Sequence, residues 1–158
     1  MKIIALSVAL TAMTTVAAFG GDVPFASPAP PSPGRPNGSD LISLADLMVV
    51  MQLRHIKLWY AGKSEDWNLV SYEIDRIRET LTRAAFLYTN IPVEYIEAVG
   101  GPLAGMHEAV AAKNSGKFLQ SYSDLTTACN SCHSAAQVGF LQIRTPTSSP
   151  FSDEVYEK

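Results

Sequence analysis

The residues best suited to chemistry are two cysteines and a histidine in the stretch TTACNSCHSAAQ, residues 126–137. Cys129 and Cys132 are the only cysteines of the chain, and His133 directly follows the second. A structural zinc ion normally takes four protein ligands, so one Cys-x-x-Cys pair needs a second pair of ligands with similar spacing. The other two histidines stand far apart in the sequence. A zinc site would therefore lack ligands.

Two interpretations of the motif remain. A dithiol redox pair uses both thiols, but it is typical of a thioredoxin-like βαβ pattern and leaves His133 without a role. In covalent haem attachment both thiols bond to the vinyl groups, and the histidine ligates the iron from the proximal side. We therefore expect one haem c per chain, bound by Cys129, Cys132 and His133. A haem-free CxxC dithiol redox protein is the alternative.

The start of the chain bears on this choice, because c-type haem is attached outside the cytoplasm. Residues 1–20, MKIIALSVALTAMTTVAAFG, contain Lys2, an apolar run from Ile3 to Leu10, and small residues towards Gly20. This pattern is typical of a secretory signal peptide, and the apolar run is too short for a spanning helix. We expect a periplasmic protein with no membrane association after cleavage of the signal peptide.

The composition then divides the chain. Six of its ten prolines fall between residues 24 and 36, so we expect residues 21–40 to be a Pro-rich disordered linker. Residues 41–139 suffice for one core and are too few for two typical domains. Residues 140–158 are expected to be an irregular C-terminal tail. A formal net charge of −3 without a basic run argues against nucleic acid as a partner.

The first of four predicted helices follows the linker. Ser43 and Asp46 make a capping box at its start, and Gly62 is expected to stop it. One apolar stripe recurs at steps of three and four, and consists of Leu44, Met48, Met51, His55 and Leu58. Val49, Val50 and Leu53 widen the apolar surface, which predicts a helix that is deeply buried or shared with a second subunit in a homodimer.

Three more helical segments follow. The inward face of the second is expected to consist of Trp67, Val70, Ile74, Ile77, Leu81 and Tyr88. The third contains Gly100, Gly101 and Pro102, so we expect a short helix before this break and a longer one beginning at Pro102. The fourth is expected from about Ser115 to Val138, with Phe118, Tyr122, Leu125, Cys129, Cys132 and Ala136 on one face. The fold class predicted is all-α, an antiparallel four-helix bundle with a C-terminal CxxCH haem attachment.

A CxxCH motif near the end of the last helix, here CNSCH at 129–133, resembles the class II cytochromes c, the cytochrome c prime family and its low-spin relatives. The resemblance covers Ser43 to about Gly139. It implies an exported four-helix bundle in which the distal side of the iron decides the function. A methionine or histidine there implies a six-coordinate electron carrier, and an open side implies a five-coordinate haem that binds gases.

The candidates for the distal position are Met48, Met51, Met106, His55 and His107. In the predicted bundle, His133 lies about 9 Å from the end of the last helix, and Met48 lies about 8 Å from the start of the first. His55 lies about 18 Å from that start, so the depth matches for Met48 and does not match for His55. The low-spin class II pattern, with an early methionine in the first helix, implies the same ligand. For His55, the alternative ligand, a hydrogen-bonded place inside the bundle is the commoner role.

The function expected is therefore a periplasmic c-type cytochrome that exchanges electrons with redox partner proteins and is not an enzyme. A five-coordinate gas-binding or sensing protein of the cytochrome c prime type is the alternative within the same family. Arg54, Lys57 and Arg144 are candidates to pair with haem propionates, although solvated charges are the commoner case.

Overall fold

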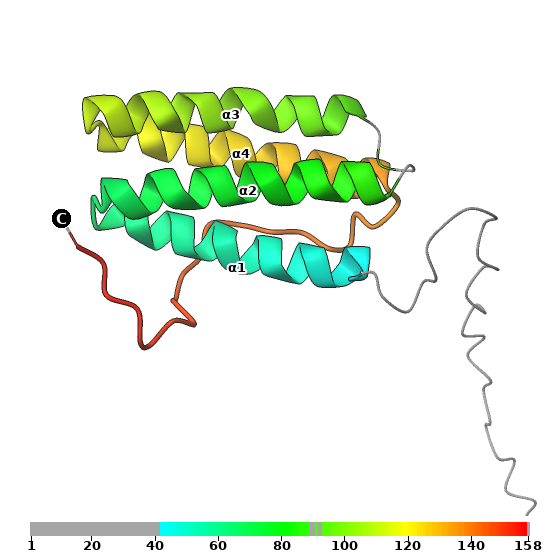
Figure 1. The fold of residues 1–158 in the computed structure, drawn as a ribbon, viewed down its shortest axis with the longest axis horizontal. Helices are drawn as coiled ribbons and strands as arrows, with labels where there is room; N and C mark the ends of the chain where they lie inside the picture. The colour runs from blue at the N-terminus through cyan, green and yellow to red at the C-terminus, as the bar shows by residue number, and fades with distance from the viewer. Residues whose placement is uncertain (1–41, 89–90, 92, 158) are drawn as a thin grey trace, which may run out of the picture. The chain divides into compact units, whose positions relative to one another are not determined.

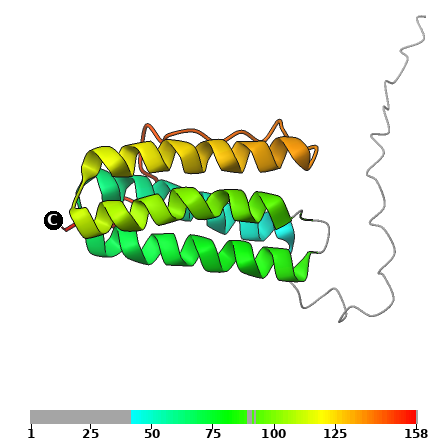
Figure 2. The same ribbon diagram turned by 90° about the horizontal axis from the view of Figure 1, so that it is seen from above.

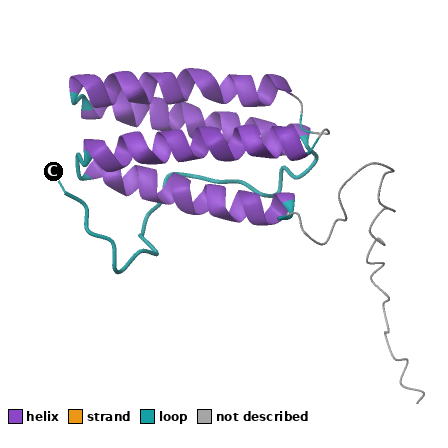
Figure 3. Cartoon of the chain, in the orientation of Figure 1, coloured by secondary structure: helices purple, strands orange, loops and turns teal. Residues whose placement is uncertain are grey.

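The computed structural model describes residues 42–88, 91 and 93–157. They form four α-helices, α1 (Leu44–Lys63), α2 (Trp67–Leu87), α3 (Val93–Ala112) and α4 (Ser115–Ala135), shown in Figure 1. Helix and loop account for every described residue, and no strand is present among them (Figure 3). The all-α prediction with four helices is confirmed. The predicted signal peptide and linker, residues 1–40, lie outside the described residues.

Neighbouring helices are joined by contacts between residues far apart in the sequence. At the start of α1, the hydroxyl of Tyr88 from the end of α2 donates to the Ile42 carbonyl at 2.5 Å. The pairs α1–α2 and α3–α4 pack most extensively, and α1 and α4 make the sparsest contact of the adjacent pairs. The largest fully buried side chains include seven on predicted helical faces, which are Leu58 on α1, Val70, Ile74 and Ile77 on α2, and Phe118, Tyr122 and Leu125 on α4. The other two are Leu103 and Met106 on α3, for which no buried face was predicted.

The predicted break in the third helix is wrong. α3 runs without interruption from Val93 to Ala112 and contains Pro102 in its interior. A proline there costs about 3 kcal/mol in helix propensity because one hydrogen bond is lost. Val99, Leu103 and Met106 are nevertheless buried on one face, which spans the site of the proline. Burial of that face favours the continuous helix over the break.

The first helix also differs from expectation near its end. Its start is as predicted, since the Ser43 hydroxyl accepts from the Asp46 N–H at 3.1 Å. Gly62, however, does not stop it. This glycine lies inside α1, where a Cβ atom would overlap the ring of Phe118, so it permits close helix packing. The chain instead reverses at Glu65, whose φ of 61° is left-handed.

The outer face of α1 is not buried within a single chain. Val49 is 58% exposed, Val50 37% and Leu53 42%. The expectation of a helix that is buried all round is therefore wrong for the isolated subunit. Its use as a subunit interface remains a prediction. None of the described helices combines the length and apolar character needed to cross a bilayer.

The C-terminal tail returns along the bundle after α4 (Figures 1 and 2). α4 ends at Ala135, earlier than predicted, because Gln137 adopts a left-handed φ of 62° and turns the chain, which leaves Ala136 exposed. The tail then contacts α1, where Lys57 Nζ lies 2.9 Å from Glu154 Oε2. Further along, the rings of Tyr60 and Tyr156 lie 6.3 Å apart.

Candidate functional site

The last two turns of α4 carry the CxxCH motif. Cys129 and Cys132 are both free and half-buried, and Cys129 packs against the hydrophobic core. Helical geometry brings residues three apart to the same side of a helix, so both thiols belong to one face of α4. His133 follows on the adjoining face and is also half-buried. The structure thus presents the three predicted attachment residues together at one helix end.

Both thiols are protonated at neutral pH. Burial raises the pKa of the Cys129 thiol to about 11 and also raises the pKa of Cys132. Catalytic dithiols work through a cysteine whose pKa is lowered by a neighbouring positive charge or a helix N-terminus. These two cysteines instead lie in the last two turns of α4, and the pKa of each thiol is raised by burial.

The orientation of His133 is set by the tail. Its Nδ1 lies 2.6 Å from the main-chain oxygen of Leu141. A carbonyl oxygen can only accept, so in the neutral imidazole the proton is on Nδ1 and the lone pair is on Nε2. No other described residue bonds to Nε2. This is the tautomer of a histidine that ligates a metal through Nε2 while a second partner holds the other nitrogen.

His55, the alternative ligand, has both ring nitrogens engaged. Nε2 lies 2.9 Å from Thr126 Oγ1, and Nδ1 lies 2.8 Å from the Tyr122 hydroxyl. The Thr126 hydroxyl donates to the Tyr122 carbonyl at 2.9 Å, and the Tyr122 hydroxyl donates to the His55 carbonyl at 3.0 Å, so the three residues form one hydrogen-bonded network. The side chain is 3% exposed, and burial lowers its pKa to about 4. These contacts match the structural role expected as the commoner one for His55.

The same contacts give the register between α1 and α4. His55 meets Thr126, and Gly62 lies against Phe118, so residue numbers rise along α1 as they fall along α4. Met48 lies seven residues before His55 and His133 lies seven after Thr126, a shift of about 10 Å along each helix. Met48, which is half-buried, therefore lies level with His133. His55 lies about two turns away from that level.

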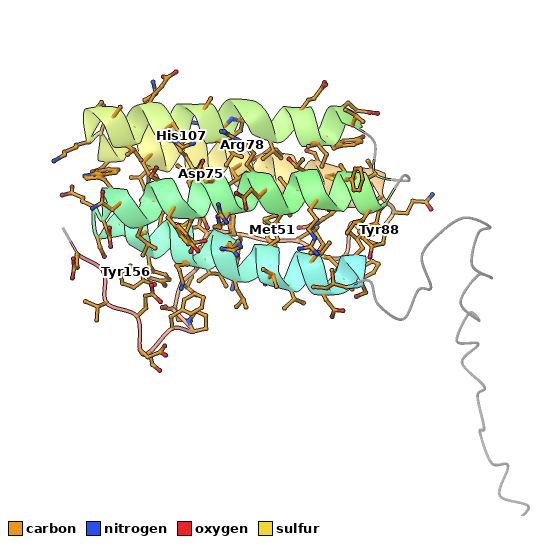
Figure 4. The ribbon with its side chains drawn as sticks, in the orientation of Figure 1. Met51, Asp75, Arg78, Tyr88, His107 and Tyr156 are labelled. Atoms are coloured by element: carbon orange, nitrogen blue, oxygen red, sulfur yellow. The ribbon has the colours of Figure 1, made fainter. Side chains whose placement is uncertain are left out.

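The remaining candidates for the distal position occupy other places. Met51 and Met106 belong to the buried core cluster. His107 is half-buried, and its Nε2 lies 3.4 Å from Asp75 Oδ1 on α2. Figure 4 shows this pair in the half of the bundle away from Tyr88, whereas the thiols belong to the end of α4. His107 is thus paired with α2, and the two methionines are part of the packed core.

The predicted propionate partners have carboxylate neighbours of their own. Arg54 Nη1 lies 3.2 Å from Glu73 Oε2, and Lys57 bonds to Glu154 in the tail. Glu73 is buried, which raises its pKa. Arg144 is exposed. Pairing of Arg54 or Lys57 with a propionate would therefore compete with a bond within the chain.

Sequence reasoning missed two contributors to the site. The first is the Leu141 carbonyl, a main-chain atom that no residue type could indicate. The second is Asn130, inside the motif, whose side chain donates to the Ile143 carbonyl and accepts from the Ile143 N–H, each at 2.9 Å. The only available indication was the polar residue between the two cysteines, followed by a tail long enough to fold back.

Several large apolar side chains are exposed on the elements at this end of the helices. Large exposed side chains include Phe86 (86%), Val93 (62%) and Phe140 (81%), which come from the end of α2, the start of α3 and the turn after α4. Two hollows, of about 430 and 210 Å³, are not lined by the thiols, and the larger one is lined by Phe86 and residues that precede it on α2. Within the described residues no three His, Cys, Asp or Glu side chains gather as a metal site.

Comparison of the chain with protein-family models, with curated proteins and with solved structures found no match in any of the three. The function is therefore inferred from the residues and their geometry.

Proposed function

We propose that this chain is an exported c-type cytochrome that transfers electrons through one covalently bound haem in the periplasm. In this proposal the helices form an antiparallel bundle similar to that of the class II cytochromes c, with the haem attached at the end of α4. The observation that carries the proposal is the state of His133. Its Nδ1 is hydrogen-bonded to the Leu141 carbonyl, and no other described residue bonds to its Nε2. It directly follows a pair of free cysteines.

Each residue of the site has one task in this proposal. Cys129 and Cys132 tether the cofactor through thioether bonds, and His133 ligates the iron through Nε2. The haem iron, when bound, supplies the one-electron chemistry. The protonated thiols and the apolar surroundings suit a hydrophobic ring more than an ionic ligand. The buried core beneath Cys129 excludes water from one side of the site.

Met48 is the proposed distal ligand. Its support is the helix register, which follows from the contacts of His55 with Thr126 and of Gly62 with Phe118. A thioether ligand raises the reduction potential relative to a second histidine. Ligation by His55 would instead require loss of at least one of its two ring hydrogen bonds in a buried place, worth about 1 kcal/mol in net stability. It would also require the haem to lie about two turns deeper along α4.

Covalent attachment is tested by expression in a periplasm that has a haem-attachment system. Denaturing electrophoresis with haem staining should show cofactor in the protein band, because thioether bonds survive unfolding. The double variant Cys129→Ala, Cys132→Ala should lose the stain. Ser131→Ala, an exposed position between the two cysteines, is the matched control and should keep it. Wild-type protein without stain would overturn the proposal.

The distal ligand is tested by visible spectra of the same preparation. If Met48 ligates the iron, the oxidised protein shows the weak sulfur-to-iron charge-transfer band, and carbon monoxide does not alter the reduced spectrum. Met48→Ala should abolish the band and admit the gas. Met51→Ala, one turn further into the core, should lower stability and keep the band. A band absent in wild type, with gas binding gained only in His55→Ala, would indicate bis-histidine ligation.

Wild-type protein that binds carbon monoxide without any substitution would instead favour the five-coordinate, gas-binding alternative.

A further inference from the structure

The chain reverses direction directly after the CxxCH motif. Gln137 has a left-handed φ of 62°, and the N–H of Val138 donates to the His133 carbonyl at 2.9 Å. The N–H of Gln137 donates to the Ser134 carbonyl at 3.2 Å, which completes a Schellman motif. The Leu141 N–H then donates to the Val138 carbonyl at 2.8 Å. These bonds bring the main chain of Leu141 back beside the His133 ring.

Two residues beyond Leu141, the returning chain is fastened to α4. The Asn130 amide donates to the carbonyl of Ile143 and accepts from its N–H, both at 2.9 Å. A side-chain amide that satisfies both main-chain groups of one residue fixes its position and its register, as a neighbouring strand would. Ile143 is half-buried, so an unpaired N–H or carbonyl there would carry a cost.

The other described polar contacts of this part of the tail are those of Leu141 with His133 Nδ1 and with the Val138 carbonyl. The next bonds along the chain are local ones between Ser149 and Phe151, and the tail is next joined to the helices through Lys57, which lies 4.9 Å from the Phe151 ring and bonds to Glu154. Between the turn after α4 and these contacts, Asn130 is the one described helix side chain besides His133 that hydrogen-bonds the segment 141–143. Asn130 is therefore the side chain that can hold the Leu141 carbonyl in place independently of the His133 ring.

We infer that Asn130 is a positioning residue, which acts through the segment 141–143 to hold the Leu141 carbonyl against Nδ1 of His133. This inference rests on the proposed haem ligation by His133. The carbonyl fixes the ring orientation and the Nδ1–H tautomer, and its acceptance of that proton raises the basicity of Nε2. Stronger donation by Nε2 stabilises the oxidised iron and lowers the reduction potential. Asn130 thus affects the reduction potential of the iron without contacting it.

The test uses the full-length, haem-loaded protein with substitutions at two positions, Asn130 and Glu154, which bind different parts of the tail. Asn130→Ala removes both bonds to Ile143. Glu154→Gln removes the charge pair with Lys57 and serves as the matched control. Asn130→Asp is the conservative variant, because it keeps the acceptor for the Ile143 N–H and loses only the donor.

Three measurements are expected to distinguish these variants. By hydrogen exchange, Asn130→Ala should lose amide protection over 141–143, whereas Glu154→Gln should lose it only over 151–157. The midpoint potential should rise in Asn130→Ala, rise less in Asn130→Asp, and stay at the wild-type value in Glu154→Gln. The iron–histidine stretching frequency of the reduced, five-coordinate Met48→Ala background should fall when Asn130→Ala is added.

The outcomes also separate this inference from the proposed function. Haem staining of wild type and Asn130→Ala should be equal, since neither attaching cysteine changes. Loss of protection over 141–143 with an unchanged potential and stretching frequency would overturn the positioning role and leave the cytochrome proposal intact. Unchanged protection in Asn130→Ala would also overturn it. Absence of haem in wild type would overturn both, while the exchange data would still report whether Asn130 fastens the tail.

Discussion

At one end of the bundle the ring of Phe118 lies against Gly62 and 6.5 Å from Trp67, whereas at the other end Phe86 is 86% exposed. The first region, the turn end, comprises the helix halves that meet at the turns 64–66 and 113–114. The second, the cysteine end, comprises residues 129–133 with the adjoining start of α1, end of α2 and start of α3. Figure 1 shows these two regions at opposite ends of the helices.

The turn end carries the stability of the fold. Phe118 and Tyr122 are fully buried there, with the Trp59 ring 4.9 Å from that of Tyr122. Burying an aromatic side chain removes about 150–250 Å² from water, so these rings dominate the core. At the cysteine end α4 contributes half-buried thiols in place of large side chains. The side chains that stabilise the fold and those of the site therefore lie in different segments of the same helices.

Two histidines show the same division. His55 is buried and both of its ring nitrogens are hydrogen-bonded. His133, about two turns nearer the cysteine end, is half-buried and has one nitrogen held by a carbonyl. Only the second keeps a nitrogen lone pair for a ligand. His55, in the turn half, is thus bonded as a structural residue, whereas His133, at the cysteine end, has one nitrogen that could bind a ligand.

The largest expected effect contrasts two phenylalanines. Phe118→Ala should lower the free energy of unfolding by about 3–5 kcal/mol, because it leaves a cavity beside Gly62. Phe86→Ala should change it by less than about 0.5 kcal/mol, because the side chain is already in water. Urea unfolding of both variants in the same buffer measures the difference. A loss of several kcal/mol in Phe86→Ala would mean that the cysteine end is also a packed core.

The sequence predicted the helices and their buried faces well, because both depend on periodicity within one segment. It failed at Gly62 and at Pro102, where local propensity favours a break. Each failure has a tertiary cause, since the glycine accommodates Phe118 and the proline lies in a helix that buries Val99 and Leu103. Propensity is a weak guide wherever burial of a whole helix face opposes it.

The site shows a similar limit. Cys129, Cys132 and His133 could be identified because their chemistry is contained in five consecutive residues. The partner of His133 is the main-chain oxygen of Leu141, eight residues later. The position of this oxygen depends on a left-handed turn at Gln137, and glutamine is not a residue type that predicts such a turn. The register of α1 against α4 likewise depends on packing, which periodicity within one helix cannot supply.

A smaller effect concerns the dependence of stability on pH. The pKa of His55 is about 4 in the folded state, against 6.5 for the free side chain. Between these values the unfolded chain binds more protons, so the stability that neutral His55 confers is complete above pH 6.5 and is lost as the pH falls towards 4. The loss should approach about 3 kcal/mol.

His55→Gln isolates this contribution, because it keeps an amide donor for Thr126 and cannot titrate. The slope of unfolding free energy between pH 4 and 6.5 should be shallower in the variant than in wild type. Glu73 contributes equally to both proteins, since its pKa, raised by burial, is unaffected by the substitution. Equal slopes would show that His55 is solvated in the folded protein, against its place in the packed half.

The smallest effect compares the turns that close α3 and α4. Lys113 at the turn end and Gln137 at the cysteine end both have left-handed φ angles, of 47° and 62°. Both belong to Schellman motifs, since the Asn114 N–H donates to the Ala109 carbonyl at 2.9 Å as Val138 does to His133. The strain of about 1 kcal/mol in each is removed by glycine, and the greater freedom of the unfolded glycine offsets part of the gain.

Lys113→Gly and Gln137→Gly should therefore each raise the free energy of unfolding by about 0.5 kcal/mol, measured by urea titration. Equal gains would show that the turn at the cysteine end is an ordinary helix stop, and that the fastening of the tail resides in Asn130. A loss of stability in Gln137→Gly alone would show that the Gln137 side chain itself holds the returning chain. In that case the cysteine end would depend on specific contacts at a point where the turn end depends only on backbone conformation.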